Sequence, residues 1–325
     1  MAPIKLPECN GPSLGPFPHN IIDEFQFLEV LNCDSRHGVI VKAKWRNQLY
    51  AIKLFISAKR IPIPYQYKYS PEYFPDLCCE HFDWHFTPFE NECRAFGRLQ
   101  EVGCEHVAVK VYGYVRVISD QVKEKLPSYQ RWLFQTLTDG NATPQMMGIV
   151  KDWVEMAEYK DKNLRSLYDR FYQVFHMPQM IENLHELHKN GIVVRDLRKD
   201  QYVNGVLVDL SCSATAPHPY GPPSAYQPLW TFSSLAAWDL YAFQLYIILS
   251  WDKEYEHLEK RLVKPRGMPN SCPFTAYTYP FSSAEAKKKA IQPYGPFLPM
   301  LNHFRHELFA TEPPRWDPQE YLENR

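Results

Sequence analysis

Two aspartates that follow short apolar runs are the residues best suited to chemistry in this sequence. Asp196 comes just after the run at residues 192–194, and Asp209 directly follows the run at 206–208. An aspartate can accept a proton from a hydroxyl or an amine, and it can also ligate Mg²⁺ or pair with a guanidinium group. Because like charges raise each other's pKa, carboxylates that share a cleft need a cation to neutralise them. The pattern therefore indicates a site that holds a metal ion or a cationic substrate.

The first half of the chain predicts an antiparallel sheet with one long helix. We expect strands at residues 27–31, 38–43, 49–55, 107–117 and 147–154, because short apolar runs alternate there with turn signals. A helix is expected from about Pro88, where apolar side chains recur every three or four positions. The polar stretch at 119–145 is predicted to be a loop or an added helix.

The second half predicts mostly helices. Met180, Leu184 and His188 share one helical face, and Gly191 is placed to end that helix in a left-handed conformation. Residues 238–250 are apolar nearly all round, which is typical of a buried helix. Strands followed by helices, with acidic residues between the halves, predict an α+β protein with two lobes around a cleft.

We therefore expect three parts along the chain. Residues 1–20, which are rich in proline, glycine and asparagine, form an extended arm. Residues 21–155 form a small N-lobe built on an antiparallel sheet, with insertions at 61–88 and 119–145. Residues 156–325 form a mainly helical C-lobe. The insertion at 61–88 is crowded with aromatic residues, which either cover a substrate or bury one another.

Composition excludes some classes of protein. The formal net charge of the 325 residues is −1, so no global field attracts nucleic acid. The longest apolar stretch is too short to cross a bilayer. The 8 cysteines have no regular spacing, and the first residues lack the pattern of a signal peptide. These features predict a reducing compartment, the cytoplasm, and no membrane.

Five motifs in order resemble the protein kinase superfamily. Ala51-Ile52-Lys53 is similar to the strand whose lysine contacts phosphates, and Glu92 stands where its helical partner would lie. Asp196 resembles the catalytic base, Asp209 the metal ligand, and Asp239 the buried aspartate that braces the catalytic loop. The resemblance implies a protein-kinase-like fold in which Lys53, held by Glu92, stabilises negative charge.

The sequence also departs from that pattern. The loop at 31–38 keeps only its last glycine, Gly38, and Asp34 brings negative charge to the place where phosphates would bind. The histidine of the catalytic loop is Val194, and the asparagine for a second metal is Gln201. The Phe-Gly that follows the metal-binding aspartate is replaced by Leu210-Ser211.

Four segments also resemble a group of fungal kinase-like proteins often labelled as a kinetochore-subunit domain: Phe89–Leu99, Val109–Tyr114, Gly148–Asp152 and Gly191–Ser211. This resemblance spans roughly residues 25–250. That group is similar to the fungal arginine-containing cyclodipeptide synthases, which use aminoacyl-tRNA and need no ATP at the peptide-forming step. The resemblance implies a transferase of secondary metabolism that requires no cofactor. Asp196 would be the proton acceptor, and Lys53 would orient Glu92 and Asp209, the candidates for binding a guanidinium or ammonium group. Gln201, Asp34 and Gly38 complete the predicted substrate site.

Two alternatives stay open beside this enzyme. An ATP-dependent phosphotransferase would use Mg²⁺, ligated by Asp209, and ATP, while a pseudokinase scaffold would have no turnover. Lys53 and Glu92 are equally compatible with a structural ion pair. A possible footprint for aminoacyl-tRNA, or else a solvated surface, comprises Lys260, Arg261, Lys264, Arg266, Lys287, Lys288 and Lys289. The oligomeric state is left open.

Overall fold

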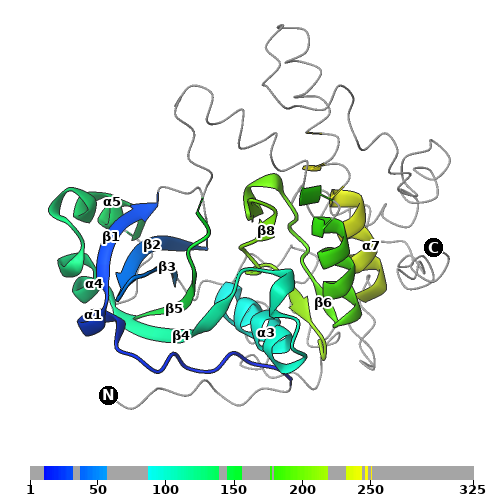
Figure 1. Cartoon of the computed structure of the whole chain (residues 1–325), viewed down its shortest axis with the longest axis horizontal. Helices are drawn as coiled ribbons and strands as arrows, with labels where there is room; N and C mark the ends of the chain where they lie inside the picture. The colour runs from blue at the N-terminus through cyan, green and yellow to red at the C-terminus, as the bar shows by residue number, and fades with distance from the viewer. Residues whose placement is uncertain are drawn as a thin grey trace, which may run out of the picture. The chain divides into compact units, whose positions relative to one another are not determined.

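The computed structural model describes residues 11–31, 37–56, 87–138, 145–155, 176–177, 179–218, 232–243, 246–247 and 250 (Figure 1). The predicted substrate residue Asp34, nearly all of the 61–88 insertion and the seven predicted RNA-binding basic residues lie outside them. The described residues fall into two compact units. One contains residues 11–154 and Leu210–Thr215, and the other contains residues 155–209 and 216–250. The predicted domain boundaries stay predictions.

A five-stranded antiparallel sheet is the framework of the first unit. Its strands are β1 (Gln26–Leu31), β2 (Gly38–Trp45), β3 (Gln48–Phe55), β4 (Val111–Ile118) and β5 (Gln145–Asp152), in the spatial order β1-β2-β3-β5-β4. Its helices are α1 (Ile21–Glu24), α3 (Pro88–Glu101), η2 (Glu105–Val107), α4 (Ser119–Lys125) and α5 (Ser128–Thr138). The predicted α+β class is confirmed.

Most of the predicted strands are found within a few residues of their expected bounds. The exception is the stretch at 107–117, where Val107 ends the short helix η2 and β4 begins only at Val111. Val107, Ala108 and Val109 are buried, so their apolar character reflects packing outside a strand. Apolar runs of this length do not by themselves separate a strand from a buried turn.

Both edges of the sheet are covered. At β1, the side chain of Gln130 in α5 accepts a hydrogen bond from the backbone N–H of Val30 (3.0 Å). Figure 1 shows α1, α4 and α5 grouped beside β1. At β4, the arm pairs with Tyr114. The N–H of Phe17 donates to the carbonyl of Tyr114 (2.8 Å), and the N–H of Tyr114 donates to the carbonyl of Gly15 (3.0 Å). Covered edges are protected from pairing with other chains.

Two glycines allow the arm to lie this close. A Cβ at Gly97 in α3 would stand 2.4 Å from the backbone carbon of Ser13, and a Cβ at Gly113 would stand 2.6 Å from the nitrogen of Phe17. Gly113 also has a φ of +146°, which side chains rarely adopt. The described part of the arm is therefore fitted to α3 and β4.

The second unit contains helical and short extended elements. Residues 179–189 are helical, and Gly191 follows with a φ of +73°, so the predicted left-handed helix end is confirmed. The elements β6 (Ile192–Val193), η3 (Lys199–Gln201), β7 (Tyr202–Val203) and β8 (Val206–Leu207) come next. Asn204 and Gly205 join β7 to β8 with positive φ at both positions, as in a type I′ hairpin turn.

The last described helix is α7 (Phe232–Phe243). It begins six residues before the predicted helix at 238–250, and Leu235 and Ala236 in this earlier part are buried. Leu240 and Phe243 are fully buried, and α7 contacts β6. No helix among the described residues is long and apolar enough to cross a membrane.

Candidate functional site

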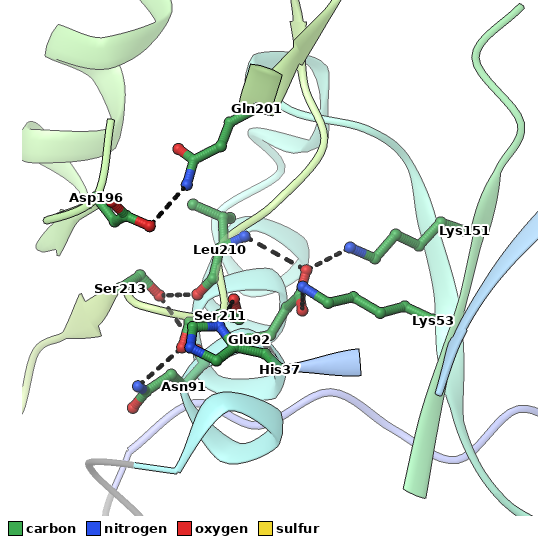
Figure 2. A network of polar contacts seen from close by, with 10 residues as sticks. All are labelled: His37, Lys53, Asn91, Glu92, Lys151, Asp196, Gln201, Leu210, Ser211 and Ser213. Carbon is green, nitrogen blue, oxygen red and sulfur yellow. Dashed lines mark hydrogen bonds and ion pairs between the residues drawn. The ribbon is translucent and has the colours of Figure 1, made fainter. Parts of the chain in front are cut away.

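The carboxylate of Glu92 is the centre of a buried polar network in the first unit (Figure 2). Glu92 lies on α3 and is 0 % exposed. One carboxylate oxygen is 3.0 Å from Nζ of Lys53, and the other accepts hydrogen bonds from Nζ of Lys151 and from the N–H of Leu210 (3.3 Å). The predicted pairing of Lys53 with Glu92 is present, and Lys151 and Leu210 share the same carboxylate.

Sheet register brings the two lysines together. Lys53 lies on β3 and Lys151 lies on the neighbouring β5, opposite Ala51, so both side chains point to one face of the sheet. Both are almost fully buried. The ammonium of Lys53 is 5.2 Å from the ring centroid of Phe55, and that of Lys151 is 5.2 Å from the ring of Phe96. The aromatic faces add favourable cation–π contacts to the ion pairs.

Lys151 is the principal site residue that the sequence reasoning did not single out. It follows the buried residues Ile149 and Val150 in β5. The sequence contained one signal for this residue, because Lys151 directly follows an apolar run in a strand that lies inside the sheet. Lysine is almost never fully buried unless it is paired, so this position predicts an acidic partner.

The segment Leu210–Thr215 is held against α3 by side-chain hydrogen bonds. The Asn91 amide donates to the carbonyl of Ser211 (3.1 Å), and Arg94 donates to the carbonyl of Thr215 (3.3 Å). The hydroxyl of Ser213 lies 2.7 Å from the carbonyl of Leu210 and 3.3 Å from that of Asn91. The segment ends in the short strand β9 (Ala214–Thr215), which contacts α3.

His37 adds a further contact from the sheet. Its Nδ1 lies 3.0 Å from the hydroxyl of Ser211 (Figure 2). Gly38, predicted to bind substrate, begins β2 beside it. A Cβ at Gly38 would stand 2.5 Å from the carbonyl oxygen of Leu54. Close packing between β2 and β3 is therefore sufficient reason for the glycine.

In the second unit, Asp239 on α7 fixes the backbone of the loop that carries Asp196. Its carboxylate accepts hydrogen bonds from the N–H groups of Val194 (2.6 Å) and Arg195 (2.7 Å). Arg195 has a φ of +72°, an uncommon conformation for a residue with a side chain. Nε2 of His188 lies 3.1 Å from the same carboxylate. The expectation that Asp239 braces this loop is confirmed.

Asp196 lies in a partly buried, polar environment. Burial raises its pKa above the usual range, the Arg198 guanidinium lowers it, and the negative charge of Asp209 raises it. Nε of Arg198 is 3.6 Å from the carboxylate, and the Gln201 amide donates to it at 3.4 Å (Figure 2). The second unit contains three of the predicted site residues, Asp196, Asp209 and Gln201. The first unit contains Lys53, Glu92 and Gly38.

The Glu92 carboxylate is fully buried, accepts two hydrogen bonds and forms an ion pair with Lys53, so it offers no exposed surface to a guanidinium or ammonium substrate. Among the residues that the structure describes, no group of three or more His, Cys, Asp or Glu side chains is placed to hold a metal ion.

Comparison with known protein families places the chain. The model of the kinetochore Sim4 complex subunit FTA2 family matches residues 2–214, about two thirds of the sequence. The chain belongs to this family. A search of curated proteins finds no match to the chain.

The family overturns the leading functional prediction. Cyclodipeptide synthesis, an enzymatic role in secondary metabolism and aminoacyl-tRNA as the partner were wrong, because the family is one of kinetochore complex subunits. The physical reason for the error is that a lysine, a glutamate and two aspartates in kinase order can stabilise a fold as well as a transition state. In this chain the carboxylates of Glu92 and Asp239 are fully buried and accept hydrogen bonds from the protein itself.

Glu90, also on α3, makes stability depend on pH. Burial raises its pKa from 4.5 to about 7, although the Arg94 guanidinium acts in the opposite direction. Between these values the folded state keeps a proton that the unfolded state has lost, so the free energy of unfolding falls as pH rises from 4.5 to about 7 and then levels off. Because Glu90 is partly exposed, we expect a loss of roughly 2 kcal/mol.

Urea unfolding from pH 4.5 to 8 checks this prediction. Glu90→Gln should remove most of the decline, whereas Glu101→Gln on the exposed end of the same helix should retain it. The same decline in wild type and Glu90→Gln would show that another group is responsible.

Proposed function

We propose that this chain is a non-catalytic, structural subunit of a kinetochore complex of the Sim4 type, and that it uses a protein-kinase-like fold as its scaffold. The match of residues 2–214 to the FTA2 family is the observation that carries this proposal. A kinetochore subunit acts in the nucleus, which replaces the cytoplasm in the proposed location. No cofactor is required in this role.

Three features support the kinase-like fold. The antiparallel sheet has five strands, with the Lys53 strand next to β5. A lysine of β3 pairs with a glutamate of the following long helix, as Lys53 and Glu92 do here. Asp239 holds the backbone of the loop before Asp196. We place the N-lobe at residues 21–155 and the C-lobe at 156–325, as the sequence predicts.

Two further features support a scaffold without turnover. A kinase needs the lysine–glutamate pair to orient phosphates, but here Glu92 also binds Lys151 and the backbone of Leu210. The segment Leu210–Thr215, which replaces the Phe-Gly side of the metal-binding triplet, is fixed by Asn91 and Arg94. In such a scaffold the role of the predicted site residues is to stabilise the two units. These residues are Lys53, Glu92, Asp196, Asp209 and Gln201.

Replacement of Asp196 tests this proposal. In source cells that express only Asp196→Asn, we expect wild-type chromosome segregation and wild-type accumulation of the fluorescently tagged chain at centromeres. A proton acceptor in catalysis would instead lose two to four orders of magnitude in rate. Asp239→Ala, which disrupts the same loop, serves as the control for loss of the folded protein. Failed segregation with normal levels of Asp196→Asn protein would contradict the proposal.

A further inference from the structure

The edge strand β4 has the composition of a strand that readily pairs with other chains. In the described part of the chain it is the last strand of the order β1-β2-β3-β5-β4, so one of its sides has no strand of the sheet beside it. Its sequence, Val-Tyr-Gly-Tyr-Val-Arg-Val-Ile, has four β-branched residues, two tyrosines, a single charge and no proline. Segments with high β-propensity, low charge and no proline are prone to pair across chains. An uncovered β4 would therefore be a site of self-association.

A short segment of the arm, residues 13–17, covers this open side of β4, and we call it the strap. Figure 1 shows the described part of the arm, in dark blue, running beside β4 between α3 and α1. The strap pairs with β4 through a parallel bridge between Pro16 and Tyr114. The N–H of Tyr114 donates to Gly15, and its carbonyl accepts the N–H of Phe17. The strap therefore uses the backbone groups of Tyr114 that a strand of another chain would need.

The strap is poorly suited to pair with a further strand on its outer side. In a parallel bridge, the residue between the two bonding positions directs its own backbone groups away from the partner strand. In the strap that residue is Pro16, which has no N–H to donate. Pro18 follows two residues later and also lacks an N–H. Because proline at a sheet edge opposes further pairing, the strap ends the sheet instead of extending it.

The strap is held at both of its ends. At its start, the N–H of Leu14 donates to the carbonyl of Cys93 in α3 (2.9 Å), and the Leu14 side chain is buried. At its end, Phe17 is part of the main hydrophobic core. Gly97 lets the start of the strap approach α3, because a Cβ at this position would overlap the backbone of Ser13. A substitution at Leu14 or Gly97 should therefore displace the strap.

We propose that the strap is an intramolecular block that prevents two copies of this chain from pairing through β4. Without the strap, the open side of β4 in one copy would meet the same side of β4 in a second copy. Antiparallel pairing of two identical strands about a two-fold axis satisfies the backbone groups of both, and it closes the assembly at a dimer. The block acts within the chain itself, whatever complex the chain joins.

Gly97→Ala in the purified full chain tests the block. Alanine is a better helix former than glycine, so α3 should tolerate the change, but the new Cβ would displace Ser13. In sedimentation experiments over a range of concentrations, we expect Gly97→Ala to reach twice the mass of the wild-type chain. Leu14→Asp, which puts a charge at a buried position of the strap, should give the same doubling and keeps the test valid if Gly97→Ala does not fold. Gly15→Ala is the matched control and should keep the wild-type mass, because a Cβ at Gly15 would meet nothing within 4 Å.

Hydrogen exchange and crosslinking show whether the strap has left β4 and what replaces it. At low concentration, the Tyr114 amide should exchange about tenfold faster or more in Gly97→Ala than in the wild-type chain, because its bond to Gly15 is lost. A photocrosslinking residue in place of Arg116, which is exposed on β4, should link two copies of Gly97→Ala through β4. Faster exchange with the wild-type mass at every concentration would overturn the proposal, as would a doubled mass without crosslinks between the two β4 strands. Wild-type exchange and wild-type mass in both variants would overturn it too, because the fit of the strap to α3 would then not close this edge.

Discussion

Asp239→Ala is expected to lower the free energy of unfolding by about 3–5 kcal/mol. The Asp239 side chain is fully buried, and its carboxylate accepts the N–H groups of Val194 and Arg195 and contacts His188. Alanine would leave these groups buried without their acceptor. Each lost hydrogen bond to a charged group costs about 1.5–3 kcal/mol, and the positive φ of Arg195 would lose the bond that holds it.

Urea unfolding of the full chain, followed by tryptophan fluorescence and circular dichroism, measures this effect. Asp200→Ala is the matched control, because the side chain of Asp200 is 65 % exposed and lies near the same loop. Its change should stay within about 0.5 kcal/mol. A loss below 1 kcal/mol for Asp239→Ala would show that the loop is held by other contacts.

Glu92→Ala is the second substitution with a large expected effect, again a loss of about 3–5 kcal/mol. It removes a carboxylate shared by two buried lysines and by the backbone of Leu210. Lys53 and Lys151 would then face each other as like charges in an environment of low dielectric constant. Glu92→Gln should cost less, because it keeps the side-chain volume and one acceptor oxygen.

Thermal and urea unfolding should rank Glu92→Ala below Glu92→Gln and both below wild type. Glu101→Ala, at the exposed end of α3, should be nearly neutral, since its pairing with Arg98 lies at the surface. If Glu92→Ala is as stable as wild type, Glu92 is kept for a reason other than folding, and the structural account of this network is wrong.

Sequence patterns were sufficient for much of the fold. Alternating apolar residues and turn signals predicted the strands that became β1, β2 and β3, and the three-to-four periodicity after Pro88 predicted α3. Prediction of secondary structure was less accurate where buried apolar residues do not follow the period of a strand or a helix. Val107 is buried in a short helix. The polar stretch at 119–145, predicted to be a loop or an added helix, contains the helices α4 and α5, and only a few of their residues, Phe134 among them, reach the core.

The main contacts of the candidate site were predicted from the sequence, but the enzymatic function assigned to them was wrong. The resemblance to protein kinases implied that Lys53 would pair with Glu92 and that Asp239 would brace the loop that carries Asp196. Lys151 was missed because a single lysine in a strand has no partner at a recognisable spacing. Its contact with Glu92 is what makes the carboxylate a structural centre. The same residue types serve catalysis when they face a ligand and serve folding when they face one another, and the sequence does not state which they face.

Affinity purification of the full chain from source cells, with quantitative mass spectrometry, is the most direct test of its membership in a kinetochore complex. We expect subunits of the Sim4 complex to be recovered with the tagged chain in comparable molar amounts and to be absent from an untagged control. Recovery of the chain at normal abundance with no enriched kinetochore subunit would contradict a structural role in this complex.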